Sequence, residues 1–458
     1  MQQREKFASR LGFILISAGC AIGLGNVYRF PIWTGAYGGA IFVVIYLAFL
    51  LLLGLPVMCA ELAVGRGSKR SIASSFDVLE KKGQKWHFVK YLGIAGNYLL
   101  MMFYTTITGW FCTYFVKYLT GSMTAESDTM SEFVGMISSP AACIIAAVIV
   151  IVLNFVVCSI GLQKGVERVT KYMMIALLLL IVGLGIYSCT LDGAAEGLKF
   201  YLIPSTESIR EYGLGTVVSA AMSQAFFTLS IGIGSIAIFG SYIGRDRSLM
   251  GESLTIIGLD TFVALMSGLI IFPAYFTFNP GSTGIGAGDA GAGFLFITLS
   301  NIFNNMPGGR IVGILFFLFM IFAAFSTIIA VFENIISFWL ELSDNKLSRR
   351  KVSLINIVLI IVLAIPAMLS ENLLADFVSG IFGKTMIDCE DFLVSNLALP
   401  IGSLIYVLFC TTKFGWGWDK FFEEMNAGKG MKLPRWLKPY MSYVLPLIIL
   451  VVLVLSVI

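Results

Sequence analysis

The sequence predicts an all-α polytopic membrane protein with eleven transmembrane helices, two of which are broken, and three observations support this prediction. Of the 458 residues, 58% are hydrophobic and 13% are charged, and the mean hydropathy of +0.89 exceeds that of water-soluble proteins. Apolar stretches recur along the chain, and about 20 such residues cross the roughly 30 Å of a bilayer core. Two of the stretches are interrupted by clustered glycines.

Eleven apolar stretches are long enough to cross the bilayer, and we treat residues 1–458 as one integral membrane domain. The expected helices cover residues 11–36, 40–65, 88–118, 141–159, 166–188, 213–240, 249–278, 310–342, 352–369, 387–411 and 440–458. The first stretch runs into Arg29 and Pro31 without a small-residue cleavage site. We therefore expect a retained first helix and not a removed signal peptide.

The positions of Lys and Arg predict the orientation in the membrane. If the N-terminus is cytoplasmic, the inside segments hold 25 of the 31 basic residues, whereas acidic residues gather in the first long outside loop. Positive charge favours the cytoplasmic side. We expect an integral membrane protein with its N-terminus inside and its C-terminus outside, and a net charge of +4 gives no indication of nucleic-acid binding.

Six of the eight cysteines fall within expected helices, so the sequence indicates no disulfide framework. Cys189 and Cys389 are both expected near the outer surface, and their pairing is left open.

The two interruptions lie five helices apart. Helix 1 carries Gly19, Gly23 and Gly25, and helix 6 reads SIGIGS over residues 230–235. Glycines weaken a helix, and the odd offset predicts an inverted repeat of residues 11–188 and 213–411, with helix 11 (440–458) appended. In membrane transporters built from inverted repeats, which are the source of this generalisation, paired interruptions mark the binding site. The alternative is that the glycines only allow close helix packing.

Polar residues on five helices are expected at one depth. Counted from the membrane face at which each helix starts, Ile22, Tyr104, Thr228, Asp260 and Ser326 lie roughly 17 to 24 Å deep. We therefore expect them to converge near the midplane.

Helix 8 offers oxygen ligands on one face. Ala323, Ser326 and Thr327 have i, i+3, i+4 spacing, which suits a hard cation such as sodium. Such hydroxyls in membrane helices also bond back to their own carbonyls. Asp260 is costly to bury in the middle of helix 7 and needs a cation, a proton or a structural partner. Glu61 is expected to hold the broken part of helix 6 through amide hydrogen bonds.

Two charge pairs are candidate gates. Arg29 and Asp391 are expected on the outer side, and Arg4 and Glu341 on the inner side, with static ion pairs as the alternative. The chain has one histidine, His87, in a basic segment, and no Walker loop. An enzyme or an ATP-driven pump is therefore not expected, and an ion gradient would supply the energy.

Residues 17–31 read SAGCAIGLGNVYRFP and residues 224–242 read QAFFTLSIGIGSIAIFGSY. These segments resemble the helix 1 and helix 6 signatures of the neurotransmitter:sodium symporter family, in its bacterial, leucine-transporter-like, eleven-helix form. The resemblance covers nearly the whole chain, and it implies a sodium-coupled amino-acid symporter that works by alternating access. An amino-acid-sensing receptor and an ion channel on the same fold remain alternatives.

The resemblance implies two sodium sites. The first is formed with the substrate carboxylate by Ala21, Asn26, Thr228 and Asp260. The second is formed by Gly19, Ile22, Ala323, Ser326 and Thr327. The implied substrate contacts are Ala21, Ile22, Leu24, Gly25, Leu100, Tyr104, Phe227, Thr228, Ser230, Ile233, Ser326 and Val331. The implied gate residues are Arg29, Asp391, Phe227, Tyr104, Arg4, Glu341 and Tyr242.

Departures from the family pattern refine this expectation. Cys20 stands where monoamine carriers place an aspartate, which favours amino acids. The side-chain pocket is mostly apolar and uncharged, which favours a hydrophobic or aromatic substrate. Asp260 stands where relatives often have asparagine, which suggests chloride independence, and Phe7 replaces the usual tryptophan of the inner gate. The sequence leaves the exact amino acid, the ion stoichiometry and the oligomeric state open.

Overall fold

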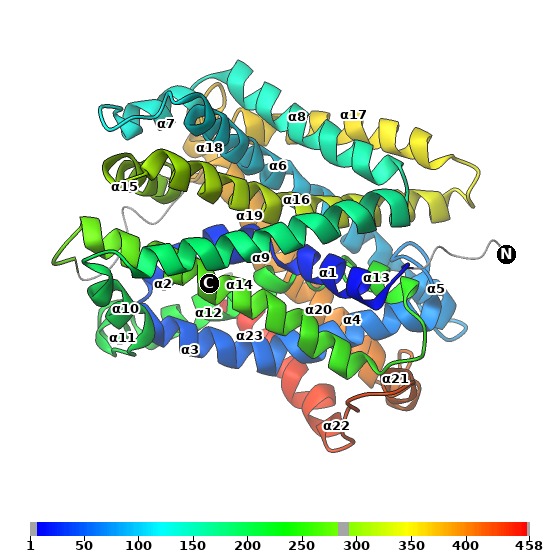
Figure 1. The fold of residues 1–458 in the computed structure, drawn as a ribbon. Coiled ribbons are helices and arrows are strands. Elements are labelled where there is room, and N and C mark those ends of the chain that lie inside the picture. The colour runs from blue at the N-terminus through cyan, green and yellow to red at the C-terminus, as the bar shows by residue number, and fades with distance from the viewer. Residues whose placement is uncertain (1–6, 283–292, 456–458) are drawn as a thin grey trace.

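The computed structural model describes residues 7–282 and 293–455, and its regular elements there are helices, apart from one isolated bridge between Arg247 and Lys429. Figure 1 shows long helices packed side by side into one bundle, with short connecting helices gathered at its two ends. The predicted all-α class is confirmed.

The helices and helical turns follow one another along the chain in the order given below. The first half contains α1 (Arg10–Ala21), η1 (Gly25–Arg29), α2 (Phe30–Ala36), α3 (Ala40–Phe49), η2 (Leu50–Gly54), α4 (Leu55–Ser68), α5 (Ser75–Leu79), η3 (Trp86–Phe88), α6 (Val89–Thr120), α7 (Thr129–Ile137), α8 (Pro140–Ser159), η4 (Leu162–Glu167), α9 (Arg168–Cys189), α10 (Ala194–Leu202) and α11 (Glu207–Tyr212). The second half contains α12 (Leu214–Leu229), α13 (Ala237–Tyr242), α14 (Leu249–Phe278), η5 (Phe294–Leu299), α15 (Ser300–Asn305), α16 (Gly309–Leu342), α17 (Arg349–Met368), α18 (Ala375–Phe382), α19 (Met386–Phe392), η6 (Leu393–Ala398), α20 (Leu399–Thr411), α21 (Trp418–Met425), α22 (Leu437–Pro439), η7 (Tyr440–Val444) and α23 (Leu445–Leu455).

Each expected apolar stretch coincides with helix in the described residues. Nine helices there are long and apolar enough to cross a membrane, and the bent pair Arg10–Ala21 and Gly25–Ala36 makes a tenth candidate. The remaining stretch, 213–240, is divided between α12, with 16 residues, and α13, with 6. It falls below the length of a continuous span because it is broken.

The break in helix 1 separates α1 from η1. Ile22 leaves the helical region with φ −71° and ψ 98°, and the two halves meet at an angle of 52°. Gly23 has room only for hydrogen, since a Cβ there would lie 2.1 Å from the Tyr104 hydroxyl. The predicted interruption is confirmed, and it brings the backbone close to helix 3.

The break in helix 6 lies between α12 and α13. Ser230, Gly232 and Gly234 have φ values of 51°, 101° and 82°, a region that glycine enters without strain and other residues rarely adopt. A Cβ at Gly232 would lie 2.3 Å from the carbonyl oxygen of Leu399. The glycines therefore both unwind the chain and let it approach α20.

Four of the membrane helices expected without a break contain or begin with a π-helical turn, in η2, η4, η6 and η7, and η4 starts helix 5 before the expected residue 166. An apolar pattern does not reveal such turns, because one inserted residue changes the hydrogen bonding but not the hydropathy. All eight cysteines are free thiols, so the open question of a Cys189–Cys389 bridge is answered: the pair is not bonded.

Candidate functional site

The broken segments of helices 1 and 6 face each other at the centre of the bundle. The Ser230 hydroxyl donates to the carbonyl of Cys20 at 3.2 Å, and the Gln224 amide donates to the carbonyl of Gly25 at 2.7 Å. All four residues are buried, and Ser230, with 7% of its surface exposed, is the most accessible of the three that have side chains. The two breaks therefore share one buried, polar region.

Glu61 of α4 holds the break in helix 6, as expected. One carboxylate oxygen accepts from the amide of Gly232 at 2.6 Å, and the other accepts from Ile236 and Ala237 at 3.0 and 3.3 Å. Asn97 of α6 donates to the carbonyl of Ile233 at 2.8 Å. Backbone groups that helix breakage leaves free are thus satisfied by buried side chains, as the membrane interior requires.

The cluster around Asp260 brings together three of the residues expected at the first sodium site. The Asn26 amide nitrogen donates to the Asp260 carboxylate at 2.8 Å, and the Thr228 hydroxyl lies 3.3 and 3.4 Å from its two oxygens. The Asn26 side-chain oxygen accepts instead from the amide of Gly23 at 3.1 Å. Ala21, the fourth expected residue, is buried in the last turn of α1.

Asp260 is fully buried, and in the described part of the chain it forms no ion pair with Lys or Arg. Neutral hydrogen bonds alone do not offset the desolvation of a carboxylate. Its surroundings therefore suit an added cation or proton better than the structural ion pair that the sequence left as the alternative.

The residues expected at the second sodium site also meet. The Thr327 hydroxyl lies 3.1 Å from the carbonyl oxygen of Gly19 and 3.3 Å from that of Ile22. The Ser326 hydroxyl lies 3.2 Å from the carbonyl oxygen of Ile22 and 2.8 Å from that of Ala323. All five oxygens thus come together between α1 and α16, and hydroxyl and carbonyl oxygens are the ligands that hard cations take. Ser326 also makes the back-bond to its own helix that the sequence left open.

A small cavity of about 10 Å³, roughly the space of one water molecule, lies between the two breaks and α6. Six of the twelve expected substrate residues line it, namely Ala21, Gly25, Leu100, Tyr104, Phe227 and Ser230. The other six are buried: Ile22, Leu24, Thr228, Ile233, Ser326 and Val331. The Tyr104 hydroxyl accepts from the amide of Leu24 at 2.7 Å. An amino acid therefore fits here only if the lining side chains move apart.

The outer pair Arg29 and Asp391 is in contact, with a nitrogen-to-oxygen distance of 3.2 Å. Arg29 also donates to Ser395 at 2.7 Å, and its guanidinium carbon lies 4.5 Å from the centre of the Phe227 ring and 4.1 Å from that of Trp33. These contacts lie between the small cavity and the side of the bundle that the sequence predicts to face outward.

A second cavity of about 410 Å³ lies beyond the outer pair, and Arg29, Phe227 and Asp391 line it. Because Phe227 lines both cavities, its ring forms part of the wall between them. Burial, together with the nearby Asp388 carboxylate, raises the pKa of Glu371 in this outer cavity.

The expected inner pair is described only in part. Arg4 lies outside the described residues, and Glu341 accepts from the amide of Ser71 at 2.8 Å and from the hydroxyl of Ser74 at 2.7 Å. The Tyr242 hydroxyl donates to the Glu333 carboxylate at 2.9 Å. The Phe7 ring packs edge-on against the Tyr242 ring, with ring centroids 5.5 Å apart. Phe7 therefore makes an aromatic contact with one of the expected gate residues.

Some residues of the site were missed by the sequence reasoning. Leu399 lines the small cavity, Gln224 and Ser267 bind carbonyls of the broken helix 1, and Arg349 pairs with the buried Glu333. A signal was present for the polar ones, because Gln224 and Ser267 lie within otherwise apolar spans.

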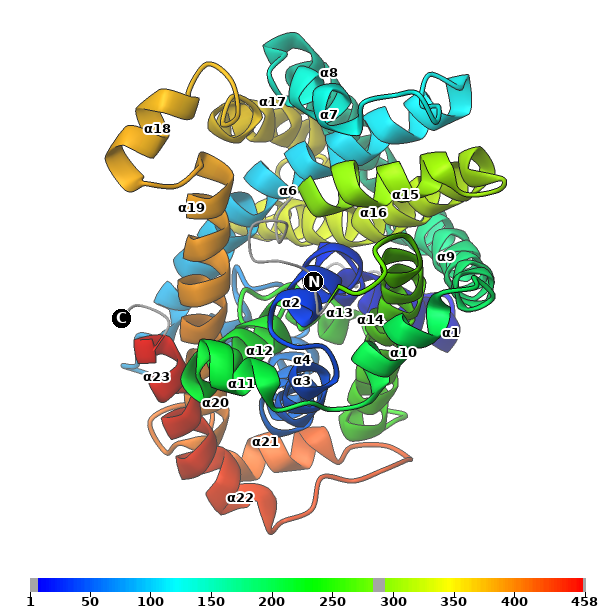
Figure 2. The same ribbon diagram turned by 90° about the vertical axis from the view of Figure 1, so that its left-hand side faces the viewer.

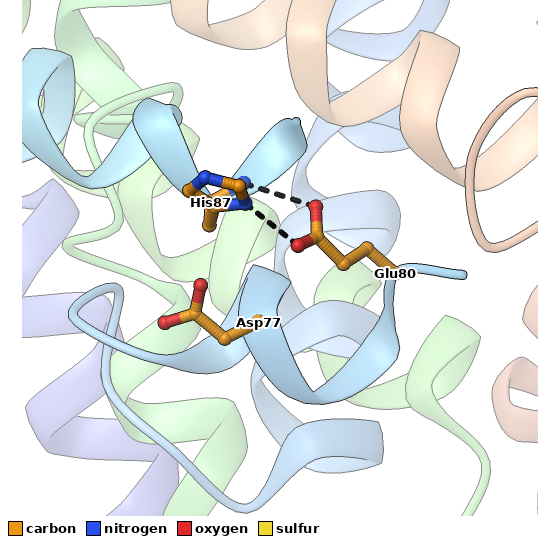
Figure 3. Close-up of side chains that lie close together, drawn as sticks. All are labelled: Asp77, Glu80 and His87. Carbon is orange, nitrogen blue, oxygen red and sulfur yellow. Dashed lines mark hydrogen bonds and ion pairs between the residues drawn. The ribbon is translucent and has the colours of Figure 1, made fainter. Parts of the chain in front are cut away.

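The one histidine lies at the start of helix 3. Asp77, Glu80 and His87 lie close together (Figure 3), and one oxygen or nitrogen atom of each lies within 4.8 Å of those of the other two. The His87 ring pairs with Glu80 at 2.7 Å, and Lys90 lies 3.5 Å from Asp77. Each carboxylate already has a partner, so the cluster joins α5 to η3.

A membrane-embedded helical bundle with two broken helices, whose free backbone oxygens meet buried hydroxyls and a carboxylate, defines a class of ion-coupled transporter. Comparison with known proteins identifies the family. The profile of the Sodium:neurotransmitter symporter family matches residues 4–132 and 126–458, so the chain belongs to that family.

The chain is similar to sodium-dependent transporters along its whole length. It is 33% identical to the uncharacterized sodium-dependent transporter YhdH of Bacillus subtilis (strain 168), over 98% of this chain and 97% of that protein. It is 28% identical to an uncharacterized sodium-dependent transporter of Haemophilus influenzae, over 98% of each chain. Its structure matches the crystal structure of MhsT in complex with L-phenylalanine, with a TM-score of 0.88, 35% identity, and coverage of 99% of this chain and 100% of that one. The protein is a sodium-dependent membrane transporter and not an enzyme.

Proposed function

We propose that the protein is a symporter that imports a hydrophobic or aromatic L-amino acid together with sodium, by alternating access. The observation that carries this proposal is the fully buried Asp260 carboxylate, which has only neutral hydrogen-bonding partners at the junction of the two broken helices. A sodium ion beside it would supply the missing charge, and the carboxylate of a bound amino acid would complete the shell of that ion.

Two sodium ions would bind with the substrate. The first would be held by Ala21, Asn26, Thr228 and Asp260, which requires the Asn26 amide to turn its oxygen toward the ion. The second would lie among the carbonyls of Gly19, Ile22 and Ala323 and the hydroxyls of Ser326 and Thr327. Support comes from the convergence of these oxygens on one side of helix 1.

The substrate would bind between Tyr104 and the two breaks. Its carboxylate would meet the first ion, the Tyr104 hydroxyl and the amides near Leu24 and Gly25, while its ammonium group would meet carbonyls that the broken helices expose. Its side chain would enter the apolar region around Leu100, Ile233 and Val331, which is buried and uncharged. The relative solved with L-phenylalanine supports an aromatic or hydrophobic substrate.

Transport would proceed by movement of the two closed ends in turn. Arg29, Asp391 and Phe227 would separate to admit the substrate from outside, and the region of Arg4, Tyr242 and Glu341 would open toward the cytoplasm. We further propose that residues 11–188 and 213–411 form an inverted repeat in the bacterial inner membrane, with the N-terminus inside. Because Asp260 carries a fixed negative charge, transport would not need chloride.

Uptake by the purified protein in proteoliposomes tests the proposal. Labelled phenylalanine should accumulate against its gradient only with an inward sodium gradient, and unlabelled leucine, methionine, tyrosine or tryptophan should compete while glutamate and lysine should not. Gluconate in place of chloride should leave the rate unchanged. Sodium-independent equilibration would indicate a channel, and binding without uptake would indicate a sensor.

The Asp260→Ala variant tests the ion role. We expect sodium-stimulated uptake to fall about 100-fold or more, because removal of one partner of a buried charge pair costs about 3 kcal/mol or more. The control is Asp419→Ala, since Asp419 is an exposed carboxylate in α21. Uptake by Asp260→Ala at the normal rate, with normal sodium dependence, would refute the assigned role.

A further inference from the structure

An apolar groove lies at the edge of the bundle, away from the transport site. It has a volume of about 260 Å³ and runs between α4, the first turn of α14 and the start of helix 11. Leu51, Leu52, Cys59, Met250, Trp436 and Tyr440 are among its lining residues. Figures 1 and 2 both show α22, which forms one side of the groove, at the rim of the molecule.

The groove opens to the surroundings, and a hydrogen bond lies beside it. Leu51 is 56% exposed and Trp436 is 73% exposed, so apolar side chains at its mouth face outward. The Tyr440 hydroxyl donates to the carbonyl of Leu52 at 2.5 Å, within the π-helical turn η2 (Leu50–Gly54). This bond joins helix 11 to helix 2 beside the groove.

Basic residues alternate with the groove residues along the chain. Lys429, Lys432, Arg435 and Lys438 are all exposed. Lys432 directly precedes Leu433, Arg435 directly precedes Trp436, and Lys438 directly follows Leu437. No acidic residue occurs from Asn426 to the end of the chain. Within residues 7–282 and 293–455 none of the four forms an ion pair.

The positive charges of this segment are therefore available to bind an anionic partner. Lys432 donates only to the carbonyls of Asn426 and Gly428, and the Arg435 guanidinium lies 5.5 Å from the centre of the Phe422 ring. Clusters of basic residues immediately beside a membrane helix favour anionic lipids, at about 1 kcal/mol for each Lys or Arg. Exposed Trp at the mouth is typical of the membrane interface.

We propose that this groove binds an anionic phospholipid of the phosphatidylglycerol type. One acyl chain lies in the groove between helices 2, 7 and 11, and the headgroup phosphate is held by Lys432, Arg435 and Lys438. Glu424, which lies just before this segment in α21, pairs with Arg66 and Arg245, so the groove lies on the side where basic residues gather and the lipid belongs to the cytoplasmic leaflet. Bound lipid stabilises the packing of helix 11 on helix 2, which carries Glu61.

Thermal unfolding of the full chain in nanodiscs tests the proposal. In phosphatidylcholine discs titrated with phosphatidylglycerol, we expect the unfolding temperature to rise with the fraction of the anionic lipid. A Lys432→Gln, Arg435→Gln, Lys438→Gln variant should need about tenfold more phosphatidylglycerol for half of the effect, or more. The matched control replaces Lys82, Lys85 and Arg350, three exposed cations elsewhere on the same side, with glutamine.

A second variant tests the location. Leu52 is 48% exposed and lines the groove, so Leu52→Trp should fold and should fill the groove. We expect it to abolish most of the phosphatidylglycerol effect even though every basic residue remains. An equal effect of phosphatidylcholine, an equal response of the two triple variants, or a normal response of Leu52→Trp would each overturn the proposal.

Discussion

Asp260 and Glu390 are two of the buried carboxylates of this protein, and their surroundings differ. Asp260 accepts hydrogen bonds from Asn26 and Thr228, and its position at the two breaks suits a cation. Glu390 of α19 is 3% exposed, and neither of its oxygens has a hydrogen-bonding partner in the described part of the chain. A buried polar group without a partner destabilises the fold, so the two residues should respond differently to replacement.

Glu390→Met should stabilise the protein. Methionine has a similar length, packs in an apolar site, and removes two unsatisfied oxygens, whose burial costs about 1 to 3 kcal/mol. We expect a higher unfolding temperature and a slower loss of fold in detergent, measured by the fluorescence of the native tryptophans.

The neighbouring residue provides the comparison. Asp391 is hydrogen-bonded to Arg29 and Ser395, so Asp391→Asn should lower or leave unchanged the unfolding temperature while slowing uptake. If Glu390→Met instead lowered the unfolding temperature as much, Glu390 would have a stabilising partner and our interpretation would be wrong.

At the scale of the helices, the breaks were predictable and their supports were less so. Clustered glycines in residues 19–25 and 230–235 indicated both interruptions, because glycine alone enters positive φ without strain. Glu61 was predicted as a support because a carboxylate inside a membrane helix needs donors. The contacts made by Gln224 and Asn97 were not predicted, since an amide side chain gives no indication of which distant carbonyl it will reach.

The limits of helices followed the hydropathy closely, but the local winding did not. Residues 249–278 were expected and observed as helix 7, whereas the π-helical turn at Leu50–Gly54 lies within an unbroken apolar run. The pairing of Arg66 with Glu424, at 2.6 Å, joins helix 2 to the segment after helix 10. Such a contact depends on how distant segments fold together, which one sequence does not reveal.

Replacement of Glu61 tests how the helix 6 break is held. Glu61→Ala would leave the amides of Gly232, Ile236 and Ala237 without an acceptor in a buried site, each at a cost of about 1 to 3 kcal/mol. We expect loss of uptake and a much lower unfolding temperature. Glu61→Gln should retain more uptake and a higher unfolding temperature than Glu61→Ala, because the one oxygen of the glutamine side chain can still accept a hydrogen bond from these amides.

The control for Glu61 is a carboxylate at the surface. Glu132→Gln removes the acidic partner of Lys117, in a pair whose side chains are 39% and 22% exposed, and should change neither uptake nor stability measurably. Normal uptake and stability of Glu61→Ala would show that the break holds its shape without this side chain.

At the scale of the whole molecule, ion pairs join both ends of helix 1 to other helices. On the outer side Arg29 joins helix 1 to helix 10 through Asp391. On the inner side Arg10 pairs with Glu252 at 3.0 Å and joins helix 1 to helix 7. Helix 1 takes part in both contacts, and its two halves, which meet at 52°, are each held by a different partner. We therefore expect a change at one end to open that end and leave the other closed.

Arg29→Gln should shift the molecule toward a state open to the outside. Arg29 is 5% exposed and holds Asp391, Ser395 and Phe227 together, and a change of about 1.4 kcal/mol in the closing free energy alters the ratio of open to closed molecules tenfold. Cys20, fully buried beside the site, serves as the reporter. We expect a charged thiol reagent added from outside to modify Cys20 several times faster in Arg29→Gln, as measured by mass spectrometry of the peptide.

The control is Lys117→Gln, which breaks the Lys117–Glu132 pair on the same side of the protein and should leave the rate unchanged. An unchanged rate in Arg29→Gln as well would show that the Arg29–Asp391 pair is a static anchor and that the closure of the outer path depends on other contacts.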